Sequence, residues 1–372
     1  MLDERQLADL MHAEVDSAER PTARLDVDRA MSTGRRQRRY RQVAGAALAV
    51  GLLVAGGVTV PSLLAPERPP TTGPADAGPP TAAAGLPAAL TTVDPEVVYV
   101  RFGWLPDGMR SLQYQSGLLL SGPGVHLSAV NSPPGELWRG VTVNLYPKGV
   151  QPSAPQRDSG EPATLTGTRP GPELNGAPSA FATYSNPDRP EAILRWRYAP
   201  DGWAQVRTHG VPGDPAQTAE RVASTLVFGH EVLPMPVTVP EVPKNLRPIT
   251  GNVSLDLGEP GSWNAYTEWS PEPADADPGR QRARTLMVAF TPYRLVTDPT
   301  DKAYVDPNTT LDGHQARFGG QDGVESLIVY DVAGLSVSIS DDGLLPSGGT
   351  RALFRKLDIG PDAAGWRPHL TR

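Results

Sequence analysis

The residue types that carry most enzyme chemistry are sparse in this chain. It contains no cysteine, which excludes thiol catalysis, thiolate-bound zinc, iron–sulfur clusters and a lipoprotein-type lipid anchor. The six histidines lie too far apart in the sequence to suggest a local metal site. No serine lies in a G-x-S-x-G elbow, and no phosphate-binding loop or G-x-G-x-x-G motif opens a helix. We therefore predict no catalytic residue, no cofactor, no bound metal and no enzymatic activity.

The densest group of oxygen ligands lies in residues 298–312. This segment carries oxygen-bearing side chains that could bind Ca²⁺ outside the cell: Asp298, Asp301, Asp306, Asn308 and Asp312. Their spacing is not that of an EF-hand, and Asp306-Pro307 is typical of a turn. We interpret the segment as an ordinary acidic, solvated loop.

Aromatic residues concentrate after residue 100, where all seven tryptophans lie. On strands such side chains usually pack in the core or across strand pairs. Trp263, Tyr266 and Trp269 differ because their surroundings are polar and rich in proline. We predict that these three residues line either a ligand groove or an interface between two modules.

An uncharged apolar run of about 22 residues occupies positions 43–64, enough for a helix to cross roughly 30 Å of hydrocarbon. It predicts a single-pass transmembrane helix. A cleaved signal peptide is the alternative, because Ala55, Gly56 and Gly57 are small enough for a cleavage site.

Five arginines precede this run in a stretch without acidic residues, and they are the predicted membrane-interface group: Arg35, Arg36, Arg38, Arg39 and Arg41. The positive-inside bias places residues 1–42 in the cytoplasm and the chain after residue 64 outside, so we predict a cell-membrane location. The lipid bilayer is then a partner, since arginines at this position also contact anionic lipids of the inner leaflet.

The segments flanking the apolar run differ in composition. In the tail, residues 1–42, Leu7, Leu10, Met11 and Val15 fall at helical spacing, which predicts a partly helical segment that could dock a cytoplasmic regulatory protein or the inner leaflet. A partly disordered tail is the alternative. Residues 65–93 are almost wholly Pro, Ala, Thr and Gly, which build no core and predict an extended linker.

Beyond the linker, short motifs return at a constant offset. LNGAPSAF and LDGHQARF lie 137 positions apart, and the matched pairs are Leu174 with Leu311, Gly176 with Gly313 and Phe181 with Phe318. A shorter loop changes the offset to 132, where Tyr198 meets Tyr330. This internal repeat predicts two tandem modules, residues 94–231 and 238–372.

Alternating apolar residues predict strands at residues 141–145, 193–198, 203–207, 286–290, 326–330 and 335–339. Hairpin turns are expected at Asp201-Gly202 and Ala333-Gly334, and a short helix ending at Gly229 or Gly360 closes each module. The predicted fold class is α+β: an N-terminal transmembrane helix followed by two β-rich modules, each an antiparallel sheet with a short C-terminal helix.

Net charge argues against one class of partner. The chain carries a formal charge of −7, and its only dense basic group precedes the apolar run. We therefore expect no nucleic acid to bind the part beyond the linker.

The stretch RLDVDRAMSTGRRQRRYR, residues 24–41, stands before the apolar run and the Pro-rich linker. In this arrangement it resembles single-pass membrane proteins of streptomycete-type actinobacteria. The repeats look like β-rich extracytoplasmic domains of regulatory membrane proteins, including some anti-sigma factors, but the zinc-binding His-x3-Cys-x2-Cys pattern is missing. The resemblance implies a cell-envelope setting and no activity.

Three functional hypotheses follow. The first is a membrane-anchored extracytoplasmic protein, without catalysis, that binds an envelope component or protein partner or senses a signal. The second is a transmembrane, anti-sigma-like regulator whose tail binds a cytoplasmic partner. The third is an exported hydrolase, which requires polar side chains converging in a groove.

Overall fold

The computed structural model describes residues 88–119, 122–131, 139–152, 154, 163–184, 191–233, 235–259, 261–271, 284–293, 306–321, 323–361 and 363–371. The chain divides into units Met1–Ala49 and Val50–Arg372, and every described residue belongs to the second. The predicted tail, the run at residues 43–64 and the five arginines lie outside the described residues. Among the residues that are described, no helix is both long and apolar enough to cross a membrane.

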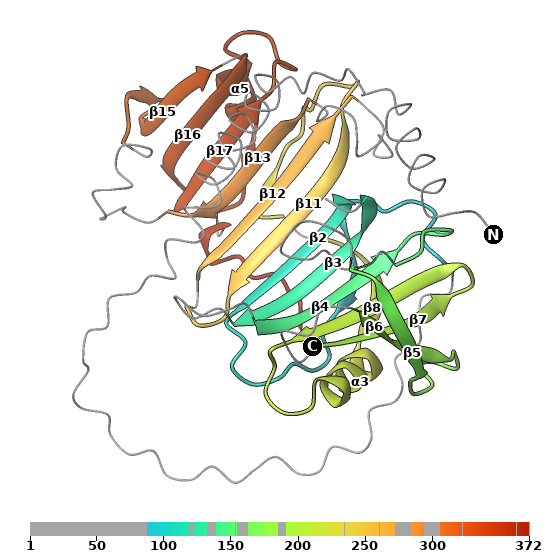
Figure 1. Cartoon of the computed structure of the whole chain (residues 1–372). Helices are drawn as coiled ribbons and strands as arrows, with labels where there is room; N and C mark the ends of the chain where they lie inside the picture. Colours follow the sequence, from blue (N-terminus) through green and yellow to red (C-terminus); the bar gives the residue numbers. More distant parts are fainter. Residues whose placement is uncertain are drawn as a thin grey trace, which may run out of the picture. The chain divides into compact units, whose positions relative to one another are not determined.

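One antiparallel sheet of 14 strands dominates the described part (Figure 1). From its centre, one half runs through β2 (Ser111–Leu119), β3 (Gly122–Asn131), β4 (Arg139–Tyr146), β8 (Gly202–His209), β7 (Glu191–Ala199), β6 (Ser179–Tyr184) and β5 (Leu165–Pro170). The other half runs through β11 (Arg247–Asp256), β12 (Trp263–Ser270), β13 (Leu286–Pro292), β17 (Leu335–Asp341), β16 (Val324–Val332), β15 (His314–Gln321) and β14 (Thr309–Leu311).

This sheet corrects the predicted fold class. The structure is mostly β, and the predicted pair of modules with a sheet each is wrong, because β2 pairs with β11 from Ser111↔Asp256 to Gly117↔Thr250. Two separate sheets would each leave an edge strand with unpaired backbone groups at this place. Pairing the two edges satisfies those groups and makes the sheet continuous.

The strand order is symmetric about the β2–β11 pair. Counted outwards, β3, β4, β8, β7, β6 and β5 occupy the same places as β12, β13, β17, β16, β15 and β14. Turns at matching places also share their backbone: Asn175 and Gly176 have φ of 52° and 77°, and Asp312 and Gly313 have 50° and 90°. This is the left-handed conformation that type I′ turns require and that Asn, Asp and Gly tolerate best.

The sheet has one apolar and one polar face, because successive side chains of a strand point to opposite sides. In β2, Leu112 and Tyr114 are buried on the apolar face, whereas Gln113 and Gln115 lie on the polar face. Among the largest fully buried side chains of the core are Trp196, Tyr114, Phe102, Phe290, Leu127, Leu194, Leu286 and Leu327.

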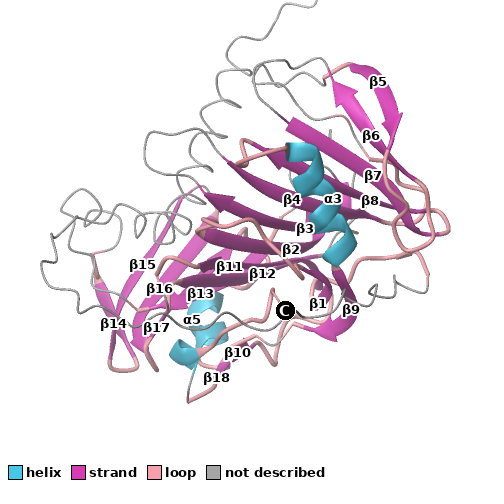
Figure 2. Ribbon diagram, turned by 90° about the horizontal axis from the view of Figure 1, so that it is seen from below, coloured by secondary structure: helices cyan, strands magenta, loops and turns pink. Residues whose placement is uncertain are grey.

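Short elements cover the apolar face. Two small antiparallel sheets, β1 (Val97–Arg101) with β9 (Val227–Val232) and β10 (Val237–Thr238) with β18 (Asp358–Ile359), lie on the same side of the large sheet as the helix α5 (Gly349–Phe354) (Figure 2). The helix α3 (Pro215–Thr225) packs on β7 and β8 through Ala219, Val222 and Ala223.

Both helices end earlier than predicted, and only α3 begins with a side-chain cap of its own. Asp214 caps α3, its Oδ1 accepting a hydrogen bond from the Ala216 N–H at 2.8 Å. The backbone leaves the helical conformation at Leu226, so Gly229 lies inside β9 rather than at a helix end. Gly360 likewise follows β18. In both cases the residues after the helix pair as a strand, which satisfies their backbone groups without a glycine cap.

The α5 N-terminus is capped by a side chain of the strand β16. Its N-cap residue, Gly348, has no side chain, and Glu325 of β16 accepts hydrogen bonds from the Gly348 N–H at 2.9 Å and the Thr350 N–H at 3.0 Å. The Thr350 hydroxyl donates a third bond to the same carboxylate at 2.5 Å.

Replacing Glu325 with alanine is therefore expected to lower the free energy of unfolding by about 2 kcal/mol, because three donors lose a charged acceptor. Urea unfolding followed by circular dichroism measures it. Glu241→Ala is the matched control: Glu241 forms an exposed ion pair with Lys356 at 2.5 Å, which is worth less than about 1 kcal/mol. Equal losses in the two variants would contradict the capping role.

Candidate binding surface on the polar face

Strand register places a row of hydrogen-bonding side chains across the middle of the polar face. In order along β7, β8, β4, β3, β2, β11 and β12, this central row consists of Arg195, Gln205, Asn144, His126, Gln115, Asn252 and Tyr266. Neighbours in the row are directly opposite each other on adjacent strands, about 4.8 Å apart in the hydrogen-bonding direction. The row therefore crosses seven strands.

Hydrogen bonds hold several members of the row in place. Arg195 Nε donates to Gln205 Oε1 at 2.8 Å, and His126 Nδ1 donates to Asn144 Oδ1 at 2.9 Å. At the centre, Asn252 is 1% exposed, and its Nδ2 has no hydrogen-bond partner in the described part of the chain. A buried amide donor of this kind costs free energy unless an acceptor reaches it.

The two halves of the sheet differ in this row. Gln115 and Asn252 face each other at the centre, and the next pair outwards is His126 and Tyr266. Further out, the first half has Asn144, Gln205 and Arg195, where the second half has Ala289, Ser338 and Ile328. Because β13, β17 and β16 pair in register with small or apolar residues here, sheet formation does not require the amides and the guanidinium. Their presence in one half indicates a role other than folding.

Burial lowers the pKa of His126 because it removes water from the imidazolium, while the hydrogen bond with Asn144 acts in the opposite direction. His126 is therefore neutral at pH 7. With Nδ1 donating to Asn144, its Nε2 is a hydrogen-bond acceptor.

This shift predicts a pH dependence of stability. The unfolded imidazole titrates near pH 6.5 and the folded one lower, so between these values the unfolded state binds more protons. Stability should fall as the pH drops below about 6.5, by at most about 1.4 kcal/mol per pH unit for this one proton. Urea midpoints at pH 7 and pH 5 for the natural protein and His126→Gln test this: the variant should lose less, and equal losses would contradict it.

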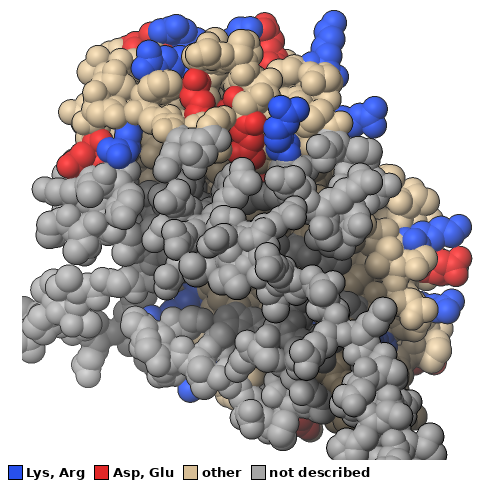
Figure 3. Space-filling view, turned by 45° about the horizontal axis from the view of Figure 1, so that its top comes forward, with Lys and Arg blue, Asp and Glu red and all other residues tan. Residues whose placement is uncertain are grey.

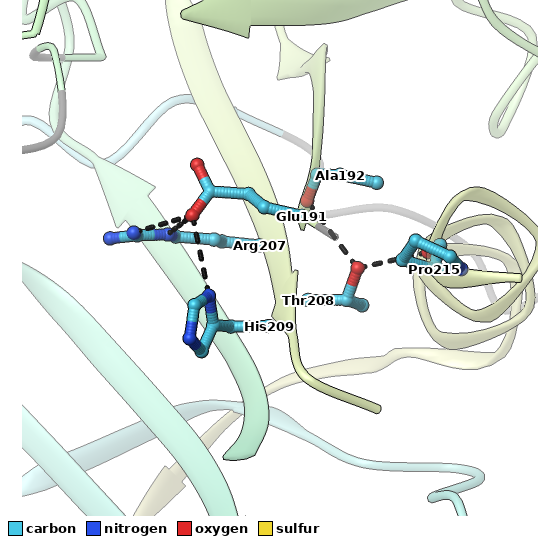
Figure 4. A network of polar contacts seen from close by, with 6 residues as sticks. All are labelled: Glu191, Ala192, Arg207, Thr208, His209 and Pro215. Carbon is cyan, nitrogen blue, oxygen red and sulfur yellow. Dashed lines mark hydrogen bonds and ion pairs between the residues drawn. The ribbon is translucent and has the colours of Figure 1, made fainter. Parts of the chain in front are cut away.

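A second polar group lies at one end of the same face. The Glu191 carboxylate accepts hydrogen bonds from Arg207 Nη2 at 2.6 Å and Nε at 3.0 Å, and His209 Nδ1 lies 3.6 Å from it (Figure 4). Thr208 points to the opposite side, where its hydroxyl donates to the Pro215 carbonyl at the start of α3. The Glu191 carboxylate thus neutralises Arg207, and the Thr208 hydroxyl holds the start of α3 against the apolar face.

The predicted groove residues do not share a face. Trp263 and Trp269 are 3% and 5% exposed on the apolar face, where the Trp263 ring contacts Trp366 at a centroid distance of 4.8 Å. Tyr266 lies on the polar face in the central row. The polar context suggested a groove, but strand alternation separates residue 266 from residues 263 and 269.

The acidic loop gives no cation site in the described residues. Asn308 Nδ2 donates a hydrogen bond to the Phe318 carbonyl, and Asn308 Oδ1 accepts one from the Phe318 N–H. Asp312 forms an ion pair with Arg355 at 3.0 Å. Asp298 and Asp301 lie outside the described residues. Within the described ranges, no three His, Cys, Asp or Glu side chains are grouped as a metal site requires. On the visible described surface, acidic and basic side chains are interspersed rather than separated by sign (Figure 3).

Sequence reasoning missed most of the central row. One signal was available: Gln115 and Asn252 are separated by 137 positions, the offset that matches Leu174 to Leu311. These two residues therefore occupy matching places in the two halves and also pair directly with each other.

Comparison with solved structures found a weak likeness, whereas comparison with families and curated proteins found none. No family model matches the chain, and no curated protein matches its sequence. The crystal structure of MucB in complex with MucA(peri) aligns with 68% of this chain and 94% of that chain, at 8% identity and a TM-score of 0.22. This TM-score is too low to establish a shared fold.

Proposed function

We propose that this protein is a non-catalytic binding protein of the cell envelope whose polar face holds a hydroxyl-rich carbohydrate polymer. The observation that carries the proposal is the inequality of the two halves: Asn144, Gln205 and Arg195 stand where matching strands pair with Ala289, Ser338 and Ile328.

The chemistry of the row favours carbohydrate. Amide side chains donate and accept at once, as does neutral imidazole, and sugar hydroxyls need both kinds of partner. Tyr266 adds an aromatic ring with a polar end at the far side of the row. An extended peptide would instead seek a free strand edge, whereas the row lies on strands that are paired on both sides. A repeating polymer matches a row that repeats from strand to strand.

The test uses the second half as its own control. In the full-length protein, Asn144→Ala with Gln205→Ser gives the first half the residue types of the matching positions Ala289 and Ser338. Since these types already pair in the same sheet, the double variant should fold. Its affinity for envelope polysaccharide, measured by microscale thermophoresis, should fall by about tenfold or more.

The matched control is Ser338→Ala, which changes the same row in the second half and should leave the affinity unchanged. Unchanged binding by the double variant, with circular dichroism showing a normal fold, would refute a role for the row. Absence of any polysaccharide binding by the natural protein would refute the function.

The location outside the cytoplasm is part of the proposal. Its support is the sequence alone: the uncharged run at residues 43–64 and the arginines before it. Protease added to intact protoplasts should digest residues 88–371 while leaving a cytoplasmic marker uncut. Protection of both would place the folded part inside.

A further inference from the structure

The β7 end of the polar face carries two arginines held against aromatic rings. Arg195 and Arg197 are two residues apart on one strand and so point to the same side. The Arg195 guanidinium lies 5.4 Å from the Tyr184 ring centroid, and that of Arg197 lies 5.3 Å from the Trp203 ring centroid. Both distances fall within the range of cation–π attraction. The stacks, together with the bond from Arg195 Nε to Gln205, restrict how the two guanidinium groups move.

The charge of Arg197 is not neutralised within the described part of the chain. Arg207, the next arginine on this face, donates twice to Glu191, which satisfies its charge. Arg197 is exposed, and its contact is the Trp203 ring, which leaves the N–H groups of its guanidinium directed to solvent or to a ligand. Stacking on an aromatic face leaves the in-plane N–H fork available.

Position in the sheet argues against a purely structural role. Arg195 continues the central row, and its matching residue in the second half is Ile328. The strand β16 forms with an apolar residue there, so β7 does not need a cation at this place. At this place in the sheet, the described residues have a cation beside an aromatic ring in the first half and an apolar residue in the second half.

We propose that Arg197, with Arg195 beside it, binds the acidic group of the carbohydrate polymer, so that the ligand is an anionic polysaccharide. This inference rests on the proposed function and adds that the bound polymer is negatively charged. A guanidinium fork matches both carboxylate and phosphate oxygens and binds them through two parallel hydrogen bonds. The half-buried amides of the central row, Asn144 and Gln115, then contact the neutral sugar hydroxyls. The acidic group comes from either a uronic acid or a phosphodiester, and the choice of probe separates these two sources.

The experiment compares three polymers on the full-length protein: polygalacturonate, poly(glycerol phosphate) and neutral dextran. At low salt, at least one anionic polymer should bind about tenfold or more tightly than dextran, and the difference should shrink at 500 mM NaCl as charges are screened. Arg197→Gln should remove that difference and leave dextran binding unchanged. Arg197→Lys keeps the charge without the fork and should give an intermediate affinity.

Arg221→Gln is the matched control, because Arg221 also stacks on a ring, that of Trp104, but belongs to α3. It should leave all affinities unchanged. Equal binding of the three polymers, or Arg197→Gln without effect, would overturn this inference while the proposed function stands. Anionic binding that depends on Arg197 but not on Asn144 and Gln205 would instead refute the role of the central row.

Discussion

Replacing Tyr114 with alanine is expected to lower the free energy of unfolding by about 4 kcal/mol. Tyr114 is 0% exposed at the centre of the apolar face. Its hydroxyl donates to the Val97 carbonyl at 2.7 Å and accepts from the Tyr99 N–H at 3.0 Å, so it joins β1 to β2. Alanine leaves a cavity the size of a phenol ring and two buried backbone groups without partners. Urea unfolding measures the loss.

Tyr114→Phe separates the two contributions. It keeps the ring and removes only the hydroxyl, so we expect a loss of about 1.5 kcal/mol. If the alanine variant does not fold, the phenylalanine variant still measures what the hydroxyl contributes to the free energy of unfolding. A loss below about 2 kcal/mol for Tyr114→Ala would mean that β1 does not depend on this residue.

The second large effect is expected at Gly251 in β11. A Cβ at this position would overlap the Pro95 carbonyl oxygen, which also accepts a hydrogen bond from the Ser116 hydroxyl at 2.9 Å. Gly251 pairs with Ser116 in the central strand pair, so the backbone has no room to move away. Gly251→Ala should cost about 3 kcal/mol.

Gly319→Ala provides the comparison. A Cβ at Gly319, on β15, would meet no heavy atom within 4 Å, so this variant should change stability by less than about 0.5 kcal/mol. Thermal unfolding of both variants should therefore show a large shift for position 251 and almost none for position 319. Similar shifts would contradict the close approach of Pro95 to the central pair.

Local patterns in the sequence predicted much of the strand content. The alternating segments at 141–145, 193–198 and 286–290 lie within β4, β7 and β13, and those at 203–207, 326–330 and 335–339 lie within β8, β16 and β17. Asp201 and Ala333 adopt positive φ of 61° and 51° in the expected hairpins. Alternation is a local property, so it survives folding wherever one face of a strand is buried.

The joining of the halves was not predicted, because it depends on residues distant in the sequence. No local pattern in residues 111–119 or 247–256 indicates that each segment pairs with a strand about 137 positions away. The motif offset was therefore interpreted as two separate modules. The same cause explains the groove residues. Trp263 and Tyr266 are neighbours in sequence, but the faces they occupy follow from strand pairing, which places one against Trp366 and the other beside Asn252.

The last described residues belong to the core of the first half. The Phe102 N–H donates to the Leu370 carbonyl at 3.1 Å, Phe102 pairs with Thr371 in parallel, and Leu370 is 1% exposed. During translation, the backbone around Phe102 therefore lacks its native partner until a segment more than 260 positions later has been synthesised. The native contacts of Phe102 form only once the ribosome has synthesised residues 370 and 371, so a nascent chain halted between the halves should be a substrate for chaperones and quality-control proteases.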